Sequence, residues 1–168
     1  FADEKINEFA SEHSTRFRVA LAEGVSSWQV YKALSEIKFL LGKLENIPDE
    51  GTIAPASYDF GIGMTKAALI KKMQERQASI LNEAWNARQP NLPINTKQEA
   101  LILASIIEKE TSLKTERGKV SSVFVNRLLR EIALQADASV VYGITRGRKV
   151  LGRGLRRSEL KKDTPWNT

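Results

Sequence analysis

The chain has 168 residues, a net charge of +6, 42% apolar residues and no cysteine. This composition is typical of a soluble globular protein, and it excludes disulfides, a thiolate nucleophile and cysteine-based metal sites. The excess charge lies in residues 143–168, which hold eight basic and two acidic residues, whereas the first 142 residues hold 18 of each. A uniformly basic nucleic-acid binder is therefore disfavoured.

Other residue types narrow the possible chemistry further. With a single histidine, His13, we expect no metal site and no cofactor, so any catalysis would use carboxylates, hydroxyls or amines. No apolar run approaches the roughly 20 residues that a membrane-spanning helix needs. The sequence begins with Phe1 rather than Met, so we expect it to be a piece of a longer chain.

Residues 1–50 have the pattern of a small mixed unit. Phe17 to Leu21 alternate with a period of two, which predicts a strand. Ser26 or Ser27 can then cap a helix that continues through Leu34. The turn signal at 48–51 places a domain boundary after residue 50.

The second part, residues 51–168, is predicted to be mainly helical. Residues 53–60 look extended, and a long amphipathic helix begins at Thr65 and ends before Pro90. Thr96 and Glu99 have the spacing of a capping box and open the next helix, from Lys97 to about Thr111.

The helix from Lys97 carries apolar residues in nearly every direction, so we expect it to be central and buried on most sides. Another helix should begin near Thr115, and beyond Leu134 the pattern fades into turns. These elements predict an α+β fold, with a small α/β subdomain followed by a helical domain around one buried helix.

Two glutamates lie in the last turns of that apolar helix. Burying a carboxylate without a partner raises its pKa, and a protonated carboxylic acid is what acid catalysis on a glycosidic oxygen requires. Glu108 and Glu110 are two positions apart, about 200° around a helix, so they cannot share a substrate atom. Glu108 lies over the small residues Ala104 and Ser105, which leave room for a ligand, whereas Glu110 lies over bulky residues and is expected to pack.

A bland alternative stays open at this point. Both glutamates could be helix-end carboxylates that are exposed or paired with Lys109 and Lys114.

Several segments in the C-terminal half resemble one known family in order and in spacing. They are Leu103–Thr111, Glu116–Arg117, Val120–Phe124, Asn126–Leu128, Leu134–Asp137, Val141–Gly143 and Asp163–Thr168. Together they resemble the endolytic murein transglycosylase family, MltG or YceG-like. Residues 16–34 resemble, more loosely, the small LysM-like subdomain of that family, and the family continues beyond Thr168 with a segment that this sequence lacks.

The resemblance implies a lysozyme-like catalytic domain over 51–168 and a peptidoglycan lytic transglycosylase. Such enzymes cut nascent glycan strands between N-acetylmuramic acid and N-acetylglucosamine and leave 1,6-anhydro ends. The catalytic glutamate of the family matches Glu108. The motif segments that would line the sugar cleft supply five candidate substrate-binding residues, which are Gln135, Asp137, Tyr142, Asn126 and Asn167.

The sequence departs from the family pattern near these residues. Glu131 stands where glycine is usual, and Ala136 and Ala138 replace a threonine and a proline. Trp166 stands where tyrosine is usual. The cleft loop is therefore expected to be looser than in the family.

The resemblance also implies a location and partners. It implies a single-pass anchor in the bacterial cytoplasmic membrane, by one helix preceding Phe1, with the catalytic domain on the periplasmic or extracytoplasmic side. The implied partners are peptidoglycan glycan strands and, as candidates, peptidoglycan synthases, with no nucleic acid. Two alternatives remain open: a non-catalytic module that binds glycan, or one that binds nucleic acid through the basic segment 143–168.

Overall fold

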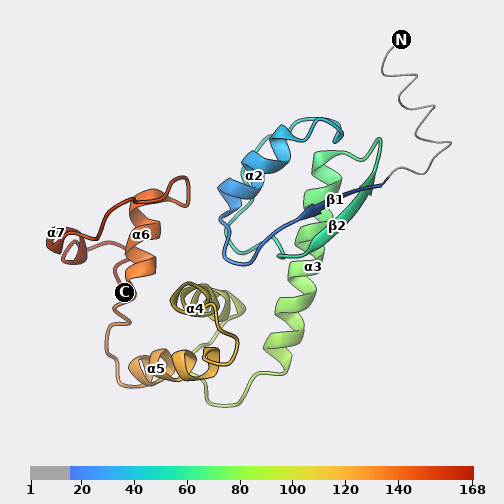
Figure 1. Cartoon of the computed structure of the whole chain (residues 1–168). Helices are drawn as coiled ribbons and strands as arrows, with labels where there is room; N and C mark the ends of the chain where they lie inside the picture. The colour runs from blue at the N-terminus through green and yellow to red at the C-terminus, as the bar shows by residue number, and fades with distance from the viewer. Residues whose placement is uncertain (1–15) are drawn as a thin grey trace, which may run out of the picture. The chain divides into compact units, whose positions relative to one another are not determined.

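The structure, a computed structural model, describes residues 16–168 (Figure 1). The first fifteen residues, including His13 and the start of the predicted 1–50 subdomain, lie outside the described residues. The chain divides into two compact units, Phe1–Ser79 and Ile80–Thr168. This division falls after residue 79, not after residue 50 where the turn signal placed it.

The first unit contains a two-stranded antiparallel sheet. Strand β1 (Arg16–Ala20) pairs with β2 (Ser57–Gly61), with Arg18 opposite Asp59. The Arg18 guanidinium donates two hydrogen bonds to the Asp59 carboxylate, at 2.6 and 3.1 Å, and they hold the pKa of that carboxyl below its usual value. The strand prediction at 17–21 and the extended prediction at 53–60 are both confirmed in outline.

Two helices complete this unit. Helix α2 (Ser27–Glu36) begins at the N-cap Ser26, whose side chain accepts a hydrogen bond from the Gln29 amide. Helix α3 (Lys66–Asn86) begins after Thr65, whose hydroxyl accepts from the Ala68 amide. Of the two predicted cap candidates, Ser26 is the N-cap of α2, and the predicted start of the long helix at Thr65 is confirmed.

One apolar core joins these elements and explains the position of the boundary. Residues from both sides of position 50 form it: Val30, Leu34, Leu40, Tyr58, Phe60, Leu69, Ile70 and Met73. Without β2 and the first half of α3, the α2 side of this core would face water, so residues 51–79 belong with the first unit.

The second unit is helical. Helix α4 (Lys97–Glu110) is capped by Thr96, whose side chain accepts from the Glu99 backbone amide, as predicted. The other half of the predicted capping box differs, because the Glu99 carboxylate accepts from the Asn95 backbone amide. Helix α5 (Arg117–Leu129) follows after a short loop. The core that α4 and α5 share contains Leu103, Ile106, Phe124 and Ala136.

Helix α4 is less buried than its composition predicts. Leu103 and Ile106 are buried, but Ile102 is 49% exposed and Ala104 and Ser105 are also exposed. The prediction of a helix buried on most sides is therefore wrong, because the packing elements cover only one face of α4.

The segment after Leu134 contains helices that the sequence pattern did not predict. Helix α6 spans Asp137–Thr145, and α7 spans Arg157–Leu160. Gly143, in the segment where turns were expected, lies inside α6, where a β-carbon would stand 2.8 Å from the β-carbon of Trp166. Glycine at this position permits the close approach of α6 to the closing segment. The α+β class itself is confirmed.

Candidate functional site

Glu108 lies in the last turn of α4 and forms an ion pair with the first residue of α5. The Arg117 Nη2 atom is 2.8 Å from the Glu108 Oε2 atom, and the two side chains are 31% and 28% exposed. The expectation of a carboxylate buried without a partner is therefore wrong. The Glu108 side chain is half-buried, partly exposed to solvent and paired with the Arg117 guanidinium.

The loop between α4 and α5 brings these two residues together. Thr111, the C-cap of α4, is buried, and its hydroxyl donates a hydrogen bond of 3.0 Å to the Glu116 carboxylate. The same oxygen accepts from the Leu113 amide at 3.1 Å. Because Glu116 directly precedes Arg117, this brace fixes the start of α5 beside the end of α4.

Glu110 differs from Glu108 in its surroundings. It is exposed, so the expectation that it packs against bulky neighbours is wrong. Glu108 is the one of the two whose side chain is partly enclosed and held by a basic residue.

The closing segment of the chain folds back onto the predicted cleft loop. The backbone amide of Gln135 donates a hydrogen bond to the Thr168 carbonyl oxygen at 2.6 Å. The Ser139 and Thr168 hydroxyl oxygens are 3.3 Å apart. Two motif segments that are separate in sequence, 134–137 and 163–168, are thereby neighbours.

The predicted binding residues have different surroundings. Asn126, Gln135 and Asp137 are exposed, and within residues 16–168 their side chains form no hydrogen bond or ion pair. Tyr142 is half-buried on α6 and already interacts with another residue of the protein. The side-chain amide of Asn167 donates hydrogen bonds to the backbone carbonyl oxygens of Leu160 and Lys162, so both of its N–H groups already stabilise the closing segment.

The structure shows the surroundings of two residues that depart from the family pattern, Glu131 and Ala136. Glu131 has a φ of 56°, in the left-handed region where glycine is favoured. Ala136 is 3% exposed and belongs to the α4–α5 core, so the apolar residue there fills the interior of the unit.

The basic segment 143–168 is only partly neutralised. Arg153 binds Glu159 through both carboxylate oxygens, at 2.9 and 2.6 Å, and the Arg156 amide adds a third hydrogen bond. These donors lower the pKa of Glu159 to about 2, the Arg153 hydrogen bonds contributing most. The Arg146 guanidinium lies 3.5 Å from the centroid of the Trp166 ring.

The sequence did not single out Arg117 or Thr111, although both lie in motif segments. One sequence feature could have indicated them: the connection between the two predicted helices is short, so the start of the second helix must lie near the end of the first. Among residues 16–168, no cluster of histidine, aspartate and glutamate has the arrangement of a metal site. In the same range, no helix combines the length and the apolar character of a membrane span.

Comparison with known proteins identifies the family. The chain matches the YceG-like family over residues 2–168 and belongs to that family. An endolytic murein transglycosylase of Bacillus subtilis is 32% identical over 122 residues, which are 72% of this chain and 32% of that protein. An endolytic murein transglycosylase of Streptococcus pneumoniae is 32% identical over 94 residues, 55% of this chain and 16% of that protein.

A solved structure supports the fold. The crystal structure of a yceG-like protein from Listeria monocytogenes has a TM-score of 0.63 and 23% identity, covering 98% of this chain and 63% of that one. The chain spans about a third of the Bacillus relative and about a sixth of the Streptococcus relative.

Proposed function

We propose that the protein is an endolytic peptidoglycan lytic transglycosylase in which Glu108 is the catalytic acid and base. The observation that carries the proposal is the position of Glu108, half-exposed at the end of α4 and paired with Arg117. Membership of the YceG-like family and two relatives named endolytic murein transglycosylase support it.

One carboxyl group suffices for this reaction. Protonated Glu108 donates its proton to the oxygen that links N-acetylmuramic acid C1 to N-acetylglucosamine, and that bond breaks. The Glu108 carboxylate then takes the proton of the muramic acid C6 hydroxyl, whose oxygen bonds to C1. The proton returns to Glu108, no water is consumed, and a 1,6-anhydro end forms. A hydrolase with two carboxylates would need a second acid at a defined separation.

Arg117 has a different role in each half of this cycle. The Arg117 guanidinium, 2.8 Å away, can stabilise the carboxylate that remains after Glu108 has donated its proton. Proton donation needs the neutral acid, so the ion pair must loosen when a sugar occupies the site. Both side chains retain about 30% exposure, which leaves Arg117 room to move toward solvent.

Replacing Glu108 with Gln tests the assignment. In the intact protein, Glu108→Gln should abolish the release of anhydro ends from un-crosslinked glycan strands, measured by mass spectrometry as the loss of water relative to a hydrolysed end. Glu110→Gln is the matched control, because Glu110 is exposed two positions further on, and it should keep wild-type activity. Full activity of Glu108→Gln would sink the proposal, and an inactive Glu110→Gln would move the role to that residue.

The same assay separates the alternatives. A non-catalytic glycan-binding relative would retain strands without releasing anhydro ends. A nucleic-acid module would bind DNA with an affinity that falls steeply with salt. Against that alternative, α7 is only four residues long, so segment 143–168 offers no long helix with aligned basic residues beyond α6.

We further propose that the substrate-facing unit works on the outer side of the bacterial cytoplasmic membrane, with the full protein anchored there by one helix. Peptidoglycan lies on that side, so an enzyme acting on it must face it. Protease accessibility of the intact protein in spheroplasts tests this, and protection of the unit from added protease would contradict it. Binding to peptidoglycan synthases remains a proposal that co-purification with those enzymes would test.

A further inference from the structure

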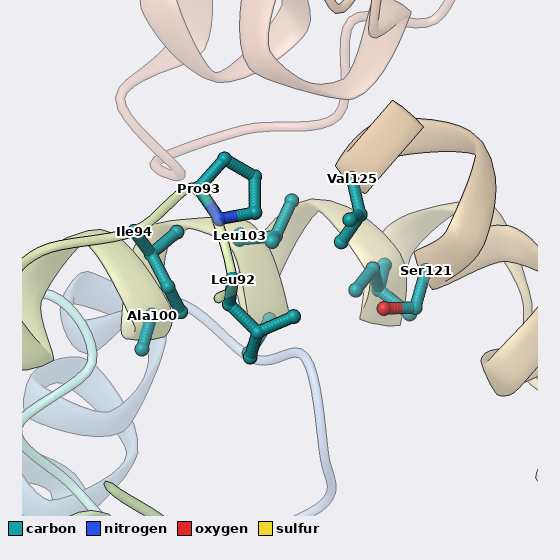
Figure 2. Close-up of a pocket in the computed structure, with 9 residues that line it drawn as sticks. Leu92, Pro93, Ile94, Ala100, Leu103, Ser121 and Val125 are labelled. Carbon is teal, nitrogen blue, oxygen red and sulfur yellow. The ribbon is translucent and has the colours of Figure 1, made fainter. Parts of the chain in front are cut away.

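A small hollow lies in the second unit, next to the Glu108–Arg117 pair. Its volume is about 190 Å³. Nine residues line it: Leu92, Pro93, Ile94, Ala100, Leu103, Ala104, Ile107, Ser121 and Val125. Figure 2 shows Ile94 and Ala100 toward one side of this hollow and Ser121 and Val125 toward the other. The lining is apolar apart from Ser121.

The hollow lies along the same two helices as the candidate catalytic pair, although neither Glu108 nor Arg117 lines it. Ala104 precedes Glu108 by four residues on α4, and Ser121 follows Arg117 by four residues on α5. Residues four apart lie on one face of a helix, separated by about 6 Å along its axis. The hollow therefore begins one helical turn from the ion pair on each helix.

The size and chemistry of the hollow limit what it can hold. Its volume lies below the about 300–1,000 Å³ typical of sites that enclose a whole ligand, so it suits a substituent rather than a sugar ring. The Ser121 hydroxyl forms no hydrogen bond to another residue of the described range. A fitting group has a small apolar end and one polar group near it.

We propose that this hollow binds the N-acetyl group of a sugar beside the bond that Glu108 cleaves. The acetyl methyl would contact Ala100, Ala104 and Val125, and the amide would hydrogen-bond to the Ser121 hydroxyl. Both sugars of peptidoglycan carry such a group, so the hollow would distinguish acetylated from de-N-acetylated strands. This inference rests on the proposed function, since it concerns the substrate of the same site.

The physical basis of the discrimination is desolvation. A de-N-acetylated sugar presents an ammonium group, which loses hydration against Leu103, Ile107 and the alanine walls and gains no counter-charge there. The acetyl methyl instead leaves water for an apolar surface. Acetylated strands should therefore react with a kcat/KM at least about tenfold higher, the range that small apolar pockets achieve.

Filling the hollow tests the proposal. Ala104 is exposed and lines the hollow, so Ala104→Leu should block it without disturbing the core. In the intact protein, this change should reduce the acetylated-to-deacetylated kcat/KM ratio to near one. Ser121→Ala, which removes only the hydroxyl, should reduce the ratio in part. Ala84→Leu is the matched control, an exposed alanine of α3 outside the lining, and it should leave the ratio unchanged.

A binding measurement separates this proposal from the proposed function. Titration of the Glu108→Gln variant with N-acetylglucosamine oligomers and with their deacetylated forms should show preference for the acetylated forms, and Ala104→Leu should remove that preference. If the wild type makes no anhydro ends but this preference is found, the hollow is supported and the proposed function fails. If anhydro ends form at equal rates from both kinds of strand, or if Ala104→Leu keeps the wild-type ratio, the hollow proposal is overturned.

Discussion

Removing the charge of Arg117 should weaken both the fold and the reaction. Arg117→Met keeps a side chain of similar length but leaves Glu108 without this partner. Exposed ion pairs contribute about 0.2–1 kcal/mol, whereas breaking a fully buried pair costs about 3–5 kcal/mol. With the two side chains 31% and 28% exposed, the pair lies between these cases. We therefore expect Arg117→Met to lower the free energy of unfolding by about 2 kcal/mol.

A transition-state effect of similar size would be visible in the rate. If the guanidinium stabilises the negative charge that develops on Glu108 as it donates its proton, a loss of about 2 kcal/mol in the transition state lowers kcat by about 30-fold. Release of anhydro ends, followed by mass spectrometry, measures this effect on kcat, and thermal unfolding measures the effect on stability.

Two further variants make this experiment decisive. Arg117→Lys restores the positive charge and should recover part of the rate, although not the planar geometry of the guanidinium. Lys119→Met removes an exposed positive charge from the same helix and should change neither kcat nor stability. If Arg117→Met lowers the melting temperature but leaves kcat unchanged, Arg117 is structural and the reasoning about its effect on the charge of Glu108 is refuted.

Three other predictions concern single positions. Glu131→Gly should stabilise the protein by about 0.5–1 kcal/mol, because a left-handed φ costs a non-glycine residue about 1–2 kcal/mol and glycine loses part of that in entropy; an unchanged or lower melting temperature would contradict this. Gly143→Ala should destabilise, because its β-carbon would stand 2.8 Å from the Trp166 β-carbon, and such a clash costs about 1–3 kcal/mol against a helix-propensity gain of about 1 kcal/mol; chemical denaturation should show the loss, which should disappear in a Trp166→Gly background, where that β-carbon is absent. The Glu159 carboxyl, whose folded pKa is about 2, contributes stability that is fully present above its unfolded pKa and is lost as the pH falls toward 2; its NMR titration should have a midpoint near 2 that rises in Arg153→Met.

The elements that the sequence predicted correctly are those specified by neighbouring residues. Ser26, Thr65 and Thr96 each accept a hydrogen bond from an amide three residues later, an interaction that spacing alone reveals. The strand at 57–61 is similar, because buried Tyr58 and Phe60 alternate with exposed neighbours. Such features depend on a few consecutive residues, so a sequence pattern suffices.

The features that the sequence missed depend on contacts between distant segments. Helix α6 contains β-branched residues and a glycine, which are weak helix formers, and Trp166 packs against that glycine from 23 residues away. The partial exposure of α4 likewise depends on which neighbours cover it, which apolar composition does not specify. Predicting that Arg117 pairs with Glu108 would have required the path of the 111–116 loop, which brings the start of α5 to the end of α4.

The candidate site combines both kinds of information, which explains why one glutamate could be chosen from sequence and its setting could not. Glu108, the Thr111–Glu116 brace and Arg117 lie within ten consecutive residues, so this acid–guanidinium pair is a local product of one helix-loop-helix. The predicted cleft residue Gln135, by contrast, lies beside Thr168 through a backbone hydrogen bond across 33 positions. The proposed chemistry at the α4 end and the proposed sugar contacts at the predicted cleft loop therefore depend on different parts of the chain. A change in the closing segment should alter how a strand is held before it alters the pairing of Glu108 with Arg117.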